Sequence, residues 1–296
     1  MKAEEIRTVT VIGAGAMGQQ IAMNTVLNGR EKGYHVFLCD SFPTALEKAG
    51  KWAADYLDGR VKKGRLSSEE ADEIGKRLSI TECVDEAVKQ ADLVIEAIIE
   101  DLETKKALFE RISRICKPDA ILGTNSSNIV SSKLAGVTEH PERLLNIHYF
   151  NPALVMELVE IVKGPHTSEE TAELVRQFAL STKKTPIVIR KEIPGFVVNR
   201  INAAVVHEAL SLLEQGAASV EDIDIACEKG LNYPMGPFRL MDLTGIDVNY
   251  YVRVDRYAES HDSYDAPNPL VVEKFKKGEF GRKTGKGWYE YPDTAR

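Results

Sequence analysis

The sequence lacks the features of a membrane or secreted protein. In its 296 residues no apolar run approaches the roughly 18 uncharged residues that a membrane-spanning helix requires. The N-terminal stretch MKAEEIRTVTVIGAG contains no signal-peptide core, because its apolar segment is short and a glycine-rich turn follows. Hydrophobic residues make up 43% and charged residues 28%, which predicts a soluble globular protein that does not act at a membrane.

Cysteine and positive charge are also scarce. The four cysteines are far apart and form no Cys-x-x-Cys pair, so neither a zinc site nor a disulfide framework is indicated, and we expect no metal. Free cysteines are typical of the reducing cytoplasm, where we expect the protein. The net charge of −7 argues against nucleic acid as a partner, so any anionic ligand must be bound by a local arrangement.

Strand-like runs alternate with helical stretches over roughly the first 190 residues. This alternation is typical of a parallel α/β sheet, and it predicts a Rossmann-type doubly wound N-terminal domain. Residues 144–162 interrupt the alternation with two strands close together. The predicted strands are 7–13, 34–40, 92–99, 120–124, two within 144–162, and 185–190; the predicted helices are one after the first strand, then 43–64, 68–77 and 103–116.

The composition changes after IPGF at 193–196. Residues 197–230 and 236–257 are rich in helix formers with helical periodicity, and strand signals vanish. Pro194-Gly195 is a plausible hinge. We therefore expect an α/β domain over residues 1–192 and an all-helical domain over residues 193–296.

A G-x-G-x-x-G motif stands directly between a predicted strand and a predicted helix. Gly13 permits a tight turn, Gly15 lets the backbone approach a pyrophosphate, and Gly18 lets the helix pack on the strand. The free N–H groups at the helix start supply an anion site. In this context the motif predicts dinucleotide binding, against the alternative of a glycine-rich turn without a ligand. Its residues are Gly13, Ala14, Gly15, Ala16, Met17 and Gly18.

Asp40 ends the second predicted strand. A carboxylate at this place accepts hydrogen bonds from the adenosine ribose and repels a 2′-phosphate, so it predicts NAD rather than NADP. The distance from the glycine loop exceeds the usual ~20 residues. The extra length lies in NGREKG (28–33), which we place near the adenosine end. The alternative for Asp40 is an ordinary carboxylate at a strand end.

His148 and Glu160 lie in the apolar run LLNIHYFNPALVMELVEIV. If the two strands form a hairpin centred near Leu154, they lie opposite each other on one face. An isolated carboxylate in such surroundings is costly to ionise, and an imidazole partner relieves that cost. This predicts a base and its orienting carboxylate, or else a structural His–Glu bond. Glu157 falls on the opposite face and is interpreted as structural or solvated.

Together with several long stretches elsewhere, these residues resemble the L-3-hydroxyacyl-CoA dehydrogenase family, and in particular its short bacterial 3-hydroxybutyryl-CoA dehydrogenases. The resemblance runs over nearly the whole chain. The matching stretches are VIGAGAMG, VIEAIIEDLETKKALF, TNSSNI, HYFNP, VMELVEIV, PGFVVNR, YPMGPFRLMDLTGID and FGRKTGKGWYEY. The resemblance implies NAD-dependent interconversion of (3S)-3-hydroxyacyl-CoA and 3-oxoacyl-CoA with short acyl chains, in fatty-acid or butyrate metabolism, by a homodimer formed through the C-terminal domain.

The resemblance also implies site residues, carried over position by position. The catalytic residues it implies are His148, Glu160, Ser127 and Asn199. Further cofactor contacts are Glu100, Lys105, Ser127, Asn151 and Lys283, and coenzyme A contacts are Ser127 and Lys63. Lys63 lies in the basic stretch RVKKGR (60–65), whose alternative interpretation is a solvated helix face.

The chain departs from the family pattern at several places. The family usually has Asn-Thr-Ser-Ser where this chain has Asn125-Ser126-Ser127-Asn128, so Ser127 is kept while its neighbours change. Tyr56 replaces a serine that contacts coenzyme A in some members. These departures leave acyl-chain preference and coenzyme A affinity open. Two other functions remain as alternatives: a dehydrogenase of free hydroxy acids on the same architecture, and a non-catalytic NAD-binding protein.

Overall fold

The computed structural model describes residues 2–291. The chain divides into two compact units, Met1–Phe196 and Val197–Arg296. The composition predicts a boundary after residue 192, and the structure divides the chain shortly after it, at Phe196. Each unit is described by itself.

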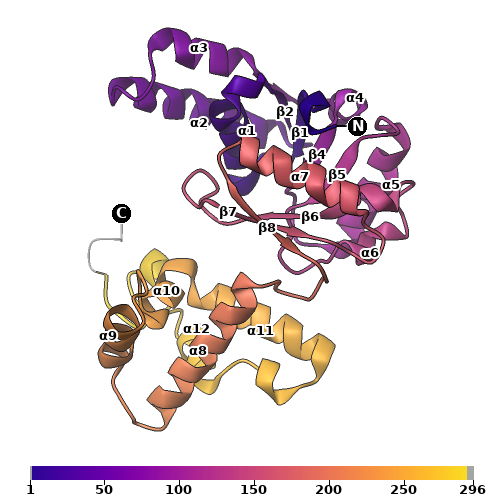
Figure 1. The fold of residues 1–296 in the computed structure, drawn as a ribbon. Coiled ribbons are helices and arrows are strands. Elements are labelled where there is room, and N and C mark those ends of the chain that lie inside the picture. Colours follow the sequence, from indigo (N-terminus) through magenta and orange to yellow (C-terminus); the bar gives the residue numbers. More distant parts are fainter. Residues whose placement is uncertain (1, 292–296) are drawn as a thin grey trace. The chain divides into compact units, whose positions relative to one another are not determined.

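The N-terminal unit is built on one eight-stranded sheet with the strand order β3-β2-β1-β4-β5-β6-β7-β8 (Figure 1). Strands β6 and β7 pair antiparallel, and every other neighbouring pair is parallel. The doubly wound order places the carboxyl ends of β1, β2, β4, β5 and β6 at one edge of the sheet. The strands are β1 (Thr8–Ile12), β2 (His35–Cys39), β3 (Leu78–Thr81), β4 (Leu93–Glu96), β5 (Ile121–Thr124), β6 (Leu144–Tyr149), β7 (Leu158–Val162) and β8 (Thr185–Ile189).

Seven α-helices accompany these strands in the described part of this unit. The predicted helices agree with α2, α3 and α5 to within one or two residues. Helix α3 begins with a reciprocal capping box, in which Ser67 Oγ accepts from the Glu70 N–H and the Glu70 carboxylate accepts from the Ser67 N–H. The helices are α1 (Ala16–Asn28), α2 (Pro43–Lys62), α3 (Ser68–Lys76), α4 (Val84–Gln90), α5 (Leu102–Ile115), α6 (Ser132–Ala135) and α7 (Glu169–Ser181).

Strand β3 was not predicted. Its four residues, LSIT, begin directly after the end of α3, and all four are only partly buried. A short edge strand carries a weak apolar signal, since one of its sides has no neighbour and its length is at the lower limit. Helices α4 and α7 were also missed.

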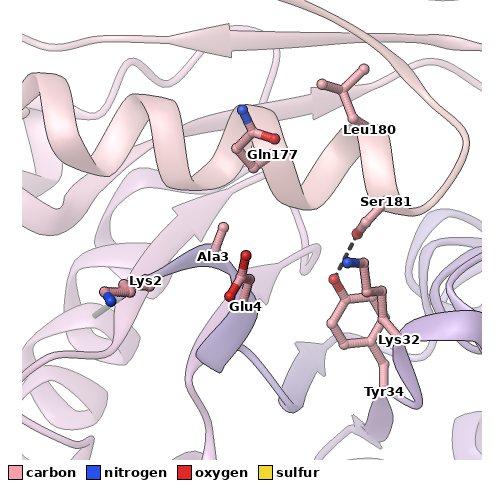
Figure 2. A pocket seen from close by; sticks show the side chains of 8 residues that line it. All are labelled: Lys2, Ala3, Glu4, Lys32, Tyr34, Gln177, Leu180 and Ser181. Atoms are coloured by element: carbon pink, nitrogen blue, oxygen red, sulfur yellow. Dashed lines mark hydrogen bonds between the residues drawn. The ribbon is translucent and has the colours of Figure 1, made fainter.

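The amino-terminal edge of the sheet is joined to α7. The Tyr34 hydroxyl, just before β2, lies 2.6 Å from Ser181 Oγ at the end of α7 (Figure 2). Burial raises the pKa of Tyr34. This contact fixes one end of α7 against the start of β2.

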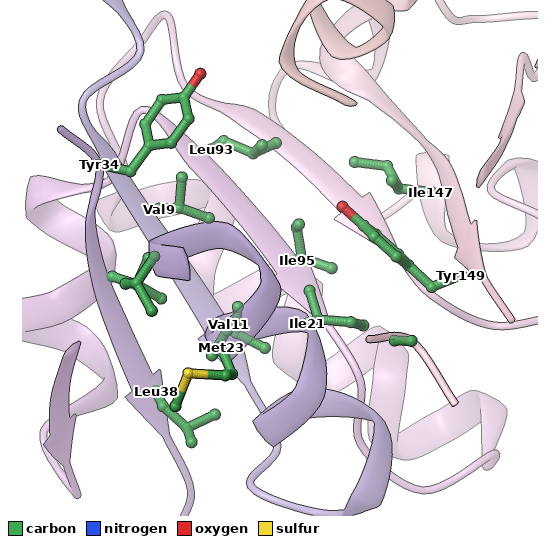
Figure 3. Close-up of a cluster of buried hydrophobic side chains, with 14 of the residues drawn as sticks. Val9, Val11, Ile21, Met23, Tyr34, Leu38, Leu93, Ile95, Ile147 and Tyr149 are labelled. Atoms are coloured by element: carbon green, nitrogen blue, oxygen red, sulfur yellow. The ribbon is translucent and has the colours of Figure 1, made fainter. Parts of the chain in front are cut away.

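Two apolar clusters cover the two faces of the sheet. Helices α1, α2 and α7 pack on one face, and α4, α5 and α6 pack on the other. The first cluster includes Met23 of α1, Ile95 of β4 and Tyr149 of β6 (Figure 3). Helices on both faces explain why the central strands are near-continuous apolar runs, as parallel strands usually are.

The C-terminal unit is all-helical, apart from isolated bridges near its end. The sequence predicts two long helical stretches, and the structure breaks both. Ser219 caps a new helix by accepting from the Asp222 N–H, and Gly245 has a φ of 104° that ends one helix and starts the next. The helices are α8 (Val198–Glu214), α9 (Val220–Gly230), α10 (Pro237–Thr244), α11 (Ile246–Ser260) and α12 (Pro269–Lys276).

Candidate active site

The glycine loop lies at the carboxyl edge of the sheet, between β1 and α1. Gly13 has a φ of 108°, which favours glycine, and its N–H donates to the Cys39 carbonyl at 2.7 Å. A Cβ atom on Gly18 would lie 1.7 Å from the Gly13 carbonyl oxygen. A Cβ atom on Gly15 would have no neighbour within 4 Å, and Gly15 is exposed. Gly13 and Gly18 therefore serve the fold, whereas Gly15 leaves space for a ligand.

Asp40 is tied to this loop from the end of β2. Its carboxylate accepts from the Ala14 N–H at 2.7 Å and from the Phe42 N–H at 3.0 Å. A cavity of about 840 Å³ opens here, large enough for a dinucleotide half. The lining includes Gly13, Gly15, Ala16, Met17, Asp40 and Ile98. Loop, carboxylate and cavity together fit a bound dinucleotide.

His148 and Glu160 pair directly across β6 and β7, which confirms the predicted hairpin register. His148 Nδ1 lies 2.8 Å from Glu160 Oε2, and the two residues are 7% and 0% exposed. An ionised carboxylate only accepts hydrogen bonds, so Nδ1 donates and the neutral ring carries its lone pair on Nε2. The rings of Phe150 and Phe196 flank the imidazole, at 4.6 and 5.5 Å between centroids. Glu157 is exposed, as expected.

The loop that closes this hairpin is held by a buried lysine. Lys184 is 6% exposed, and its Nζ donates to the carbonyls of Ala153 at 2.5 Å and Met156 at 2.8 Å. Burial lowers the pKa of Lys184. Asn151 is exposed in the same loop, so Lys184 helps to fix a segment that carries a predicted cofactor contact.

Ser127 lies in the segment after β5, at the same edge as His148. Strands β5 and β6 are parallel, with Thr124 paired to Asn146, so both residues lie just beyond that pair. Asn125 Oδ1 also accepts from the Tyr149 N–H at 2.9 Å, which joins the two strand ends. Ser131 does not cap α6 with its side chain; its hydroxyl donates to Glu192 at 3.1 Å.

A buried ion-pair network connects two more predicted residues, and it contains one that the sequence reasoning missed. Lys105 is 1% exposed, and its Nζ lies 2.5 Å from Glu96 Oε1 and 3.4 Å from Glu100 Oε2. Glu96 is fully buried at the end of β4 and also accepts from Thr124 Oγ1 at 2.6 Å. The Ser126 hydroxyl donates to Glu100. Glu96 could have been found by the argument that selected Glu160, since it is a carboxylate inside an apolar strand.

Three predicted residues lie away from this cluster or in the other unit. Lys63 is exposed at the end of α2 among other basic side chains, which leaves both interpretations of RVKKGR open. Asn199 is the second residue of α8, in the C-terminal unit. Lys283 belongs to the same unit, where its Nζ lies 2.6 Å from Asp247 Oδ2.

The predicted position of the NGREKG insertion is wrong. The segment precedes β2, whereas Asp40 follows it, and five strand residues separate the two by about 16 Å. Lys32 from this segment instead lines a second cavity, of about 620 Å³, at the amino edge of the sheet (Figure 2). Ligands of open α/β sheets bind at the opposite edge, so the insertion is remote from the nucleotide cavity.

Neither a metal site nor a membrane span is found in the described residues. No group of three or more His, Cys, Asp or Glu side chains within residues 2–291 could hold a metal ion. No helix in the same range is long and apolar enough to cross a bilayer.

The sequence matches the models of two domains that belong to one protein family. Residues 8–193 match the model of the 3-hydroxyacyl-CoA dehydrogenase NAD binding domain, and residues 195–291 match the model of the 3-hydroxyacyl-CoA dehydrogenase C-terminal domain. The chain therefore belongs to the 3-hydroxyacyl-CoA dehydrogenase family.

Individual relatives match along nearly their whole length. A probable 3-hydroxybutyryl-CoA dehydrogenase of Bacillus subtilis is 36% identical over 291 residues, covering 98% of this chain and 99% of the relative. The human mitochondrial hydroxyacyl-coenzyme A dehydrogenase is 36% identical, covering 97% and 91%. The crystal structure of (S)-3-hydroxybutyryl-CoA dehydrogenase PaaH1 from Ralstonia eutropha matches with a TM-score of 0.89 at 36% identity, covering 97% and 99%. The predicted family, fold class, enzymatic nature and NAD cofactor are thereby confirmed.

Proposed function

We propose that the protein is an NAD-dependent dehydrogenase that interconverts short (3S)-3-hydroxyacyl-CoA and 3-oxoacyl-CoA thioesters, with 3-hydroxybutyryl-CoA and acetoacetyl-CoA as the first candidates. The observation that carries this proposal is the buried His148–Glu160 pair at the same sheet edge as a dinucleotide loop. Relatives with full-length matches are named for this chemistry.

The reaction requires a group on the protein that accepts a proton in one direction and donates it in the other. His148 Nε2 removes the proton from the C3 hydroxyl in the oxidative direction and returns it in reduction. Bound NAD accepts or supplies the hydride at C3. Glu160 holds the imidazole through Nδ1 and stabilises the imidazolium that forms, which is the role of an orienting carboxylate.

Two further side chains hold the reacting oxygen in this proposal. Ser127, in the segment after β5, donates a hydrogen bond to the C3 oxygen and limits its orientation, and Asn199 from the C-terminal unit makes a second contact. Glu100, Lys105, Asn151 and Lys283 contact the cofactor. The support for these roles is the family resemblance together with the location of Ser127, Glu100 and Lys105 at one sheet edge.

The proposal also includes the binding of coenzyme A and the oligomeric state. Lys63 and its basic neighbours bind phosphates of coenzyme A on an otherwise acidic chain. The C-terminal unit forms a homodimer in the cytoplasm. Large apolar side chains exposed on that unit are available for such an interface. They include Ile201, Leu231, Leu243, Val248 and Tyr251.

The test is a cofactor and substrate comparison in one assay. NADH oxidation is followed by absorbance with acetoacetyl-CoA, and parallel reactions contain NADPH or free acetoacetate. Turnover that requires both NADH and the thioester supports the proposal. Turnover of the free acid alone would identify a hydroxy-acid dehydrogenase instead. Tight NADH binding without turnover on short or long acyl thioesters would indicate a non-catalytic NAD-binding protein.

A further inference from the structure

Asn146 is a fully buried amide on β6, two residues before His148 and on the same face of the strand. Its side chain makes three hydrogen bonds, and all three go to the backbone of one segment. Nδ2 donates to the Ser126 carbonyl at 3.2 Å and to the Ile129 carbonyl at 2.9 Å. Oδ1 accepts from the Ser131 N–H at 2.8 Å.

The backbone groups that these three bonds reach lie both before and after Ser127 in the sequence. The segment lies between β5 and α6 and has no regular structure of its own, so its backbone groups need partners from elsewhere. Asn146 supplies three of them with one rigid side chain whose backbone is fixed in the centre of the sheet. These bonds therefore fix the position of Ser127 relative to β6, the strand that carries His148.

The Ser126 side chain adds a local bond that makes this segment compact. Ser126 Oγ accepts from the Ile129 N–H at 2.7 Å and donates to Glu100. Asn146 and Ser126 therefore fix the backbone on either side of Ser127 without using the Ser127 hydroxyl. A hydroxyl that is held only through its backbone is free to bind the substrate oxygen.

We infer that Asn146 is a positioning residue, which sets the distance and direction from Ser127 to His148. The inference rests on the proposed function, because it assigns Ser127 to the substrate oxygen. A displacement of about 1 Å in such a group can lower the rate about 100-fold. Asn146 itself is buried beneath the segment and is not proposed to contact the substrate.

A merely structural role is the competing explanation, and Asn24 provides the matched control. Asn24 is also fully buried in the same unit, but it lies on α1 and donates to the Thr182 carbonyl at 3.4 Å. Asn146→Ala removes the partner of three backbone groups, and Asn24→Ala removes the partner of the Thr182 carbonyl and of the Asn28 side chain, so both are expected to lower the melting temperature.

The experiment measures the two substitutions in the wild-type chain and in a Ser127→Ala chain. With wild-type Ser127, Asn146→Ala is expected to lower kcat about 10- to 100-fold, a larger factor than any rise in KM for NADH through the cofactor contact of Ser127. In the Ser127→Ala chain, the same substitution is expected to change kcat by less than about threefold, because the group it positions is gone. Asn24→Ala is expected to have the same small effect on kcat in both chains.

Amide hydrogen exchange gives a second readout that does not depend on turnover. Exchange at the Ser131 N–H is expected to accelerate in Asn146→Ala more than in Asn24→Ala, since its acceptor is removed. If Asn146→Ala does not fold, Asn146→Ser keeps a smaller polar group, and the same comparison applies. Equal effects of Asn146 substitution with and without Ser127 would overturn the inference. A wild-type chain without activity would overturn the proposed function, whereas an active wild type with a fully active Asn146→Ala overturns only this inference.

Discussion

The two halves of the carboxyl edge of the sheet are built in different ways. Around β1 and β2 the site is built on a glycine turn and the N-terminus of α1, beside an open cavity whose lining includes the charged side chains of Asp40 and Arg111. Around β5, β6 and β7 the site consists of buried polar side chains on neighbouring strands, with Asn146 and His148 on β6 and Glu160 on β7.

This difference predicts how each half responds to substitution. A backbone site needs room and a correct turn, so it is sensitive to added atoms. A side-chain site needs particular functional groups in a fixed register, so it is sensitive to removed atoms. The first half is therefore expected to control cofactor affinity and the second half to control the rate of the chemical step.

The largest effect is expected from His148→Gln. The amide cannot exchange a proton with the C3 oxygen, so kcat should fall by roughly 10²–10⁴, the range for loss of a general acid–base. Steady-state kinetics with acetoacetyl-CoA measures this effect, and NADH binding should remain near normal by fluorescence titration.

The control for this substitution is His35→Gln. His35 lies on β2, where its Nε2 is 3.0 Å from Ser79 Oγ, and it is not part of the proposed site. Near-normal turnover in a folded His148→Gln variant would remove His148 from the chemistry.

A pair of glycine substitutions tests the backbone half. Gly18→Ala places a methyl group against the Gly13 carbonyl and is expected to cost about 1–3 kcal/mol of unfolding free energy. Gly15→Ala meets nothing in the protein, so the variant should fold normally and raise KM for NADH about tenfold or more, by occupying the space of the pyrophosphate. Thermal melts and NADH titrations separate the two effects. Normal NADH affinity in Gly15→Ala would contradict the proposed cofactor position.

The same division explains what the sequence could and could not predict. The glycine motif is local, and each of its residues has a requirement that follows from backbone geometry alone. The His148–Glu160 pair was predicted because parity within one hairpin fixes which residues share a face. Asn146 was missed because its partners, in the segment 126–131, lie on another element and depend on strand order. Glu96 has its partner Lys105 only nine residues further on, and it could have been found as a carboxylate inside an apolar strand.

The C-terminal helices show a further limit. Periodicity indicated helices over residues 197–230 and 236–257, but it could not place the breaks at Ser219 and Gly245. Both breaks depend on a single capping residue or a positive φ, and such signals are weak within a run of helix formers.

A smaller effect is expected from Asp40→Ala, which tests the choice between cofactors. Removing the carboxylate removes the repulsion of a 2′-phosphate and a ribose hydrogen bond, so the ratio of kcat/KM for NADH to that for NADPH should fall about tenfold. Asp40 also accepts from Ala14 and Phe42, so Asp40→Asn is the informative companion because it keeps an acceptor without the charge. An unchanged ratio in both variants would remove Asp40 from cofactor selection.

The smallest effect is expected from Lys184→Met, which loosens the hairpin loop without touching its chemistry. The carbonyls of Ala153 and Met156 lose their donor, so the loop that carries the predicted cofactor contact Asn151 is held less firmly. We expect KM for NADH to rise about threefold while kcat changes little. Lys183→Met is the control, because it removes the same charge from an exposed neighbour.

The pH dependence of stability distinguishes these two lysines. Burial lowers the pKa of Lys184 in the folded state. Between that pKa and the unfolded value of about 10.4, the unfolded chain therefore binds more protons than the folded chain does. Lys184 therefore contributes an increase of stability with rising pH in this window. The increase should be absent in Lys184→Met and retained in Lys183→Met, as measured by chemical denaturation at several alkaline pH values. Identical pH profiles for the two variants would contradict the lowered pKa of Lys184 in the folded state.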